Sequence, residues 1–159
     1  MPDKNLIYRK IAEILKQLNY IKKLIKLSEK QLLLEETQLF LAERVMERLI
    51  GAAIDINMHL VSDIRGEVSQ DYFNSFIDLA QLKVFPIGFA KKIAPSAGLR
   101  NILVHEYQEL DLKKFRASMK MALENFPKYV RYIEKVMENA EFGISEKEIL
   151  KRSKEKKIS

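Results

Sequence analysis

The sequence predicts an all-helical protein, folded as an up-and-down bundle of about five helices. Apolar residues recur at intervals of three and four along most of the chain, which is the period of one face of an α-helix. The 159 residues include 5 glycines and 4 prolines, too few for the frequent turns of an all-β fold. No segment shows the strict apolar–polar alternation that indicates a strand. The length suits one compact domain.

The first part of the chain predicts two long helices. Residues 4–27 carry one continuous apolar stripe, formed by Ile7, Ile11, Ile14, Leu18, Ile21 and Ile25. Ser28 and Gln31 have the spacing of a capping box and start a second helix. Its apolar stripe continues to about Ile64, and we expect any bend to fall near Gly51.

Shorter helices are predicted in the middle of the chain. Gly66 is the expected stop of the second helix, and Ser69 is the expected N-cap of the third. The inward face predicted for the third helix consists of Tyr72, Phe73, Phe76, Leu79 and Ala80. Residues 89–107 are predicted to be helical in two pieces, with Pro95 in the first turn of the second piece.

Asp111 is the expected N-cap of the last helix, and Pro127 within that helix predicts a kink. The stripe that faces inward is Leu112, Phe115, Met119, Ala122, Phe126, Val130, Ile133 and Met137. Packing on helix surfaces, rather than stacking on bases, is expected for Tyr8, Tyr20, Tyr129 and Tyr132. We expect residues 1–139 to form the domain and residues 140–159 to form a charged, flexible tail.

Composition excludes several classes of protein. The 28 basic and 22 acidic residues give a net charge of +6, which permits contact with nucleic acid without requiring it. The absence of cysteine excludes disulfides, thiolate zinc sites and a cysteine nucleophile, and two histidines are too few for a histidine metal cage. No apolar run is long enough to span a membrane. We therefore expect a cytoplasmic protein with no metal, no cofactor and no membrane partner.

Residues 98–111, GLRNILVHEYQELD, hold most of the residues suited to chemistry. Together with a basic residue that follows the segment, they are Arg100, Asn101, His105, Glu106, Tyr107 and Arg116. A neutral imidazole exchanges protons near neutral pH, and a guanidinium matches phosphate oxygens with two parallel hydrogen bonds. This pair could activate an RNA 2′-hydroxyl, stabilise charge on the phosphate and protonate the leaving 5′-oxygen.

Helix geometry leaves the placement of this pair open. At roughly 100° per residue, Arg100 and His105 project about 140° apart on an ideal helix, whereas Arg100 and Tyr107 share nearly one face. The helix distorts, the arginine swings across, or two copies of the motif face each other in a dimer; we favour the dimer, with some distortion. In the competing interpretation, His105 is an ordinary helix residue and Arg100 a surface ion-pair partner.

The pattern Arg100-Asn101-x-x-x-His105-x-Tyr107 resembles the Arg-x4-His-x-Tyr signature of HepT-like toxins in the HEPN superfamily. Similarity extends to Gly98-Leu99 before the motif, Asp111 after it, and the segment at 52–59 in the second helix. The resemblance spans roughly residues 5–138.

This resemblance implies a dimeric HEPN-type bundle with metal-independent endoribonuclease activity on an RNA substrate. It implies that Arg100 and His105 are the catalytic pair and that Asn101 supports them. It also implies a partner, an MntA-like minimal nucleotidyltransferase antitoxin, which transfers AMP from ATP to the motif tyrosine, here Tyr107. That modification would silence the nuclease by adding bulk and negative charge where the RNA phosphate must lie.

Asp55 and His59 form a secondary candidate on the second helix, since a spacing of four lets their side chains interact. We interpret them as a structural or dimer-interface pair; alternatively, Asp55 orients a catalytic group in the cleft. Three functions stay open: a ribonuclease toxin, a non-catalytic HEPN subunit that binds nucleotide or acts as scaffold in a nucleotidyltransferase complex, and a helical interaction module whose motif is coincidental. The intact motif favours the first.

Overall fold

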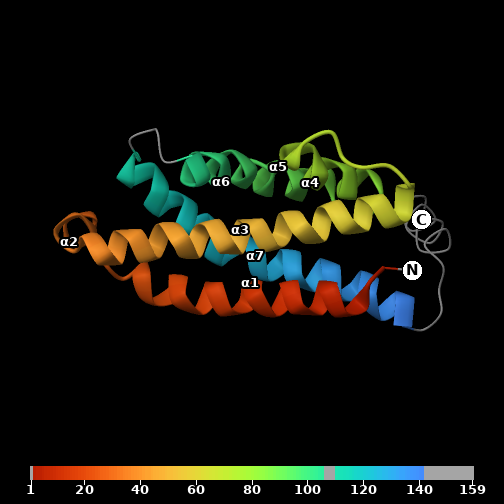
Figure 1. Ribbon diagram of the computed structural model, residues 1–159, viewed down its shortest axis with the longest axis horizontal. Coiled ribbons are helices and arrows are strands. Elements are labelled where there is room, and N and C mark those ends of the chain that lie inside the picture. Colours follow the sequence, from red (N-terminus) through yellow and green to blue (C-terminus); the bar gives the residue numbers. More distant parts are fainter. Residues whose placement is uncertain (1, 106–109, 142–159) are drawn as a thin grey trace.

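The computed structural model describes residues 2–105 and 110–141, and this part of the chain is all-helical, as predicted. Three helices are long and four are short (Figure 1). The helices are α1 (Lys4–Leu24), α2 (Glu29–Leu34), α3 (Glu36–Arg65), α4 (Tyr72–Gln81), α5 (Ile87–Ile93), α6 (Ser96–His105) and α7 (Leu112–Glu141). The helix α7 extends two residues into the predicted tail of residues 140–159, and residues 142–159 lie outside the described part of the chain.

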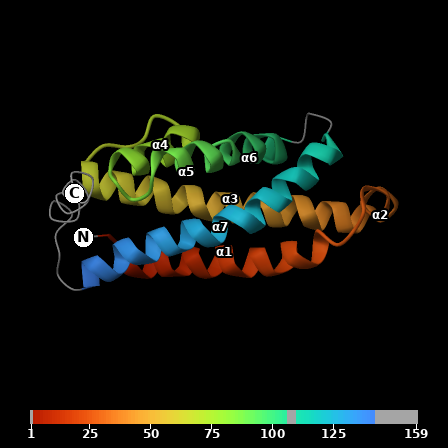
Figure 2. The same ribbon diagram turned by 180° about the vertical axis from the view of Figure 1, so that it is seen from behind.

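The helix α3 is the centre of the bundle. It packs against α1 on one side and against α4 and α6 on the other, as Figure 1 shows. The last helix, α7, crosses behind α3 on a diagonal and packs against α1, which Figure 2 shows from the opposite side. No helix in the described ranges is long and apolar enough to cross a membrane.

The first helix follows the prediction closely. Asp3 caps it, because its carboxylate accepts the backbone N–H of Leu6 at 3.1 Å. Five members of the predicted stripe are buried, and Ile25 lies just beyond the helix, half-buried. The helix ends at Leu24, three residues before the predicted end at 27.

The predicted second helix is in fact two helices, α2 and α3. The capping box of Ser28 and Gln31 is present, as predicted. The chain then breaks at Glu35, whose backbone angles are φ −108° and ψ 81°, and not at Gly51, which lies inside uninterrupted helix. The break follows Leu33 and Leu34, which are 68% and 74% exposed and so provide no buried stripe to hold the helix together.

The structure confirms Gly66 as the C-cap of α3, in a left-handed conformation with φ 78°. The N-cap of α4 was predicted wrongly. It is Asp71 rather than Ser69, because the Asp71 carboxylate accepts the Asn74 backbone N–H at 2.7 Å and its charge suits a helix N-terminus.

The inward face of α4 is also smaller than predicted. Phe76, Leu79 and Ala80 are buried, but Tyr72 and Phe73 are 47% and 44% exposed. Tyr72 lies beside the charged side chain of Arg100 instead of within the apolar core.

The last helix, α7, begins as predicted. Asp111 caps α7 by accepting the Lys114 backbone N–H at 3.1 Å, and α7 continues through Pro127 as one helix. Every member of the predicted stripe is buried except Leu112, which is half-buried. Tyr129 packs between helices and is fully buried, and its hydroxyl has hydrogen-bond partners on α3.

Candidate functional site

The helix α6 carries the motif at its C-terminal half. Arg100 is half-buried there, whereas Asn101 and His105 are exposed. His105 is the last residue of α6. Tyr107, the predicted modification site, lies outside the described residues.

Arg100 projects from α6 onto α3 and α4. Its guanidinium carbon lies 5.4 Å from the centre of the Tyr72 ring, within the range of a cation–π contact. A Cβ built on Gly51 of α3 would lie only 3.3 Å from Arg100 Nε, so the arginine occupies the space that the glycine leaves. The Nε atom is buried and has no hydrogen-bond partner among the described residues.

The two predicted catalytic residues are not brought together within the described part of one chain. No hydrogen bond joins Arg100 to His105. This agrees with helix geometry, in which side chains five positions apart project about 140° apart. Arg100 faces inward towards α3 and α4, while His105 is exposed where α6 ends.

The tip of α4 that meets Arg100 is anchored to the core by buried polar groups. The Ser75 hydroxyl donates to the Tyr72 carbonyl oxygen at 2.6 Å and accepts from the Asn57 side-chain amide at 3.1 Å. Asn57 Oδ1 lies in turn 2.6 Å from the hydroxyl of Tyr129 on α7. Three helices therefore fix the backbone that carries Tyr72.

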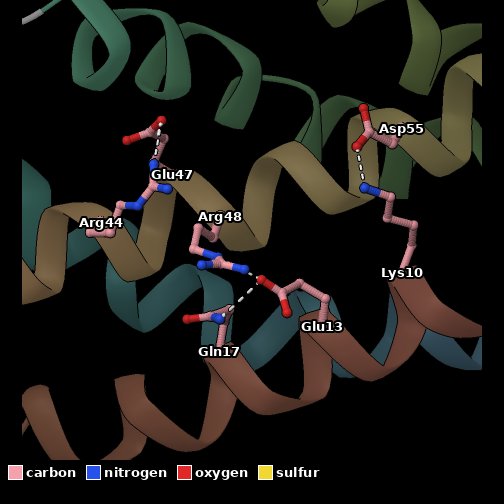
Figure 3. A network of polar contacts seen from close by, with 7 residues as sticks. All are labelled: Lys10, Glu13, Gln17, Arg44, Glu47, Arg48 and Asp55. Carbon is pink, nitrogen blue, oxygen red and sulfur yellow. Dashed lines mark hydrogen bonds and ion pairs between the residues drawn. The ribbon is translucent and has the colours of Figure 1, made fainter.

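Asp55 and His59 each contact α1 instead of each other. Asp55 forms an ion pair with Lys10 at 2.8 Å (Figure 3). The backbone N–H of Asp3 donates to His59 Nε2 at 2.9 Å. The spacing of four allowed an interaction within the pair, but the partners found are Lys10 on α1 and Asp3, the N-cap of α1.

A second polar network also joins α1 to α3, farther along their interface. Glu13 forms a 2.6 Å ion pair with Arg48 and accepts a hydrogen bond from Gln17 (Figure 3). Burial alone would raise the pKa of the Glu13 carboxyl, but the Arg48 hydrogen bond and charge outweigh it, so this pKa is lowered. This network joins the two helices and lies outside the motif.

Arg116, which the sequence grouped with the motif, is used elsewhere. Its guanidinium donates to the Ile25 carbonyl oxygen at 3.2 Å and so closes the C-terminal end of α1. Within the described ranges, no group of three or more histidine or acidic side chains is arranged to hold a metal ion.

Sequence reasoning missed Gly51 and Tyr72 as neighbours of Arg100. A glycine inside a long helical pattern is a signal of close approach by another group, but we interpreted Gly51 only as a site for a bend. No sequence signal connects Tyr72 to Arg100, because their contact depends on how α4 and α6 pack.

The helical bundle and its motif define a HEPN-type protein. The Ribonuclease HepT-like family matches residues 14–133, and the chain belongs to that family. It is 36% identical to the tRNA nuclease HepT of Aphanizomenon flos-aquae over 128 residues, covering 80% of this chain and 87% of the relative. It is 32% identical to the mRNA nuclease HepT of Shewanella oneidensis over 88 residues, covering 55% of this chain and 66% of the relative.

Solved structures share the fold. One is a tri-AMPylated HEPN toxin of Shewanella oneidensis in complex with an MNT antitoxin, with a TM-score of 0.75, 27% identity and coverage of 84% of this chain and 99% of that one. Another is a toxin–antitoxin with AMP-PNP, with a TM-score of 0.71, 26% identity and coverage of 82% of this chain and 99% of that one.

Proposed function

We propose that this protein is a metal-independent endoribonuclease, the toxin of a HEPN/nucleotidyltransferase toxin–antitoxin module. One observation carries the proposal: a chain of the ribonuclease HepT-like family holds a half-buried Arg100 and an exposed His105 on a single helix, in the Arg-x4-His-x-Tyr arrangement. The relatives named tRNA nuclease and mRNA nuclease support RNA as the substrate.

In the proposed mechanism, His105 accepts the proton of an RNA 2′-hydroxyl, which then attacks the neighbouring phosphorus. Arg100 stabilises the negative charge that grows on the phosphate oxygens, which is the larger part of the catalytic effect in such sites. A protonated imidazole then supplies the proton that the leaving 5′-oxygen needs. Asn101, exposed one residue after Arg100, supports the phosphate with its amide.

We propose that a second copy of the chain completes this site. Arg100 and His105 project in different directions from one helix, so one phosphate is reached more readily by residues of two copies of α6. Ile102 and Val104 on the same helix are apolar and 37% and 42% exposed, which suits a surface covered by another copy. Light scattering should give twice the mass of one chain, and Val104→Glu should reduce both that mass and RNA cleavage.

The test is cleavage of tRNA and of mRNA by the purified protein in the presence of EDTA. His105→Ala and Arg100→Ala should each reduce cleavage by a factor of about 100 or more, the usual effect of losing an acid–base or charge-stabilising group. Circular dichroism should show the same helix content in both variants. Full cleavage by either variant would remove that residue from the mechanism.

We further propose that the partner antitoxin silences the protein by AMPylating Tyr107. The tri-AMPylated HEPN toxin found with its MNT antitoxin in Shewanella oneidensis supports this regulation. The phenol oxygen would attack the α-phosphorus of ATP, releasing pyrophosphate and leaving a negatively charged AMP on Tyr107. Labelled AMP should be incorporated by the parent and not by Tyr107→Phe, and the labelled parent should lose RNA cleavage.

A protein that accepts AMP but cleaves no RNA would instead be the non-catalytic scaffold of a nucleotidyltransferase complex.

A further inference from the structure

We propose that Tyr72 is a positioning residue for Arg100, and that Gly51 provides the space in which the arginine is held. The inference rests on the proposed function, since it concerns how the phosphate-binding arginine is kept in place. It assigns a role to two residues outside the motif, one on α4 and one on α3.

The first step is the contact itself. An arginine side chain has several rotatable bonds, and holding it in one conformation costs rotamer entropy. The centre of the Tyr72 ring lies 5.4 Å from the guanidinium carbon. The flat, electron-rich face of the ring attracts the guanidinium and so restricts its movement. Tyr72 is 47% exposed, so its burial against the core does not explain its place at this end of α4.

The second step is the glycine beneath the arginine. Gly51 lies inside α3 and is not among the residues with positive φ, so the backbone there does not require glycine. A glycine in a helix interior makes the helix less stable than an alanine would. What the position does require is space, because a methyl group would lie 3.3 Å from Arg100 Nε.

The third step is the buried Nε atom, for which the described part of the chain offers no hydrogen-bond partner. An unsatisfied buried donor destabilises the folded state. Together with the glycine, it makes this corner of the bundle less stable than the fold alone would allow. Such local departures from stability are typical of functional sites.

The fourth step is the rigidity of the residue that holds the arginine. The Tyr72 carbonyl accepts from Ser75, whose hydroxyl accepts in turn from Asn57 in the core. Asp71 caps the same turn. The backbone of Tyr72 is therefore fixed from both ends, and its ring can act as a stationary support for Arg100.

The experiment measures kcat and KM for RNA cleavage by the full-length protein. Tyr72→Ala should lower kcat by about tenfold, the effect of weakening one transition-state contact, with KM changed by less than about twofold. Tyr72→Phe keeps the ring and should retain kcat within about twofold. Phe73→Ala is the matched control, because Phe73 is 44% exposed on the same turn of α4.

Gly51→Ala separates positioning from stability. Alanine should leave the unfolding midpoint unchanged or raise it, because it favours helix, while displacing Arg100 and lowering kcat by about tenfold. In an Arg100→Lys background, Tyr72→Ala should have less than about a twofold further effect, since the group that it positions is gone.

An NMR measurement adds a readout that does not depend on activity. The Arg100 Nε–H resonance should carry a ring-current shift that is lost in Tyr72→Ala and kept in Tyr72→Phe. If the parent cleaves RNA while Tyr72→Ala and Gly51→Ala match its kcat, the inference is wrong and the proposed function stands. If the parent cleaves no RNA, the proposed function fails and the positioning role fails with it.

Discussion

The hydroxyl oxygen of Tyr129 lies 2.6 Å from Asn57 Oδ1, joining α7 to α3 in the middle of the bundle. The Ala53 carbonyl oxygen is 3.0 Å from the same hydroxyl, and the phenol has one proton to donate, so the shorter contact is the better bond. Both residues are fully buried. This buried polar pair therefore joins α7, which begins after the motif, to α3, which packs against the motif helix α6.

The first prediction concerns this pair. Tyr129→Phe should lower the free energy of unfolding by about 1–2 kcal/mol, because Asn57 Oδ1 loses its donor inside the core. Urea unfolding measures the change. The control is Tyr132→Phe on the same helix. The Tyr132 ring contacts Phe85 and Phe89, and phenylalanine should preserve these ring contacts. Equal stability of Tyr129→Phe and the parent would show that the hydroxyl contributes nothing.

The second prediction is an alkaline loss of stability. Burial, and to a lesser degree the charge of Asp55, raises the pKa of Tyr129 well above its ordinary value of 10.0. Above pH 10 the unfolded chain therefore releases this proton while the folded chain keeps it. The free energy of unfolding should fall with rising pH, by about 1.4 kcal/mol per pH unit from this one group.

Unfolding by urea at several pH values between 8 and 11.5 checks the slope. Tyr129→Phe removes the group, so its decline above pH 10 should be shallower than that of the parent, and below pH 9 the two curves should run parallel. Identical slopes above pH 10 would mean that Tyr129 ionises equally in the folded and unfolded chain.

The third prediction compares two glycines with open space around them. Gly66 ends α3 with φ 78°, and Gly98 lies inside α6 without a positive φ. Gly66→Ala should cost about 1–2 kcal/mol, because alanine must adopt the left-handed region. Gly98→Ala should gain up to about 1 kcal/mol from helix propensity. Thermal or urea unfolding of both variants should give opposite signs, and the same sign in both would contradict this account.

The sequence was sufficient for the helices because their signals are local. Stripes of apolar residues, the capping box at Ser28 and the caps at Gly66 and Asp111 all act over a few residues. The break at Glu35 was missed because leucines there continue the apolar pattern, although Leu33 and Leu34 face solvent. Periodicity states which residues share a face and not whether anything covers that face.

The candidate site likewise divides into residues that the sequence could indicate and neighbours that it could not. The candidate residues on α6 could be singled out by their residue types within one short segment, and the roles predicted for them came from the resemblance to HepT-like toxins. Their surroundings could not, because Tyr72 and Gly51 reach Arg100 only through the packing of α4 and α3 on α6. Asp55 and His59 are a related case: helix spacing allows them to interact, but their partners in the structure lie on α1 and at its N-cap.

The last prediction concerns His59 and separates a structural role from a catalytic one. The Nε2 atom of His59 accepts a hydrogen bond from the Asp3 backbone N–H. Asp3 in turn begins α1, because its carbonyl oxygen accepts from the Ile7 N–H at 3.1 Å and its carboxylate accepts from the Leu6 N–H. His59→Ala should therefore loosen the first turn of α1 at a cost of about 0.5–1.5 kcal/mol. Hydrogen exchange should become faster at the Leu6 and Ile7 amides and stay unchanged in α6.

Asp3→Ala is the matched variant, since it removes the cap from the other side of the same turn and should produce the same exchange pattern. RNA cleavage should match that of the parent in both variants, because the contacts of His59 lie on α1 and not at Arg100. A tenfold or greater loss of cleavage in His59→Ala, with cleavage retained in Asp3→Ala, would instead place His59 in the ribonuclease site. Comparing the two variants gives that answer even if both fray α1 equally, since fraying alone would lower their cleavage together.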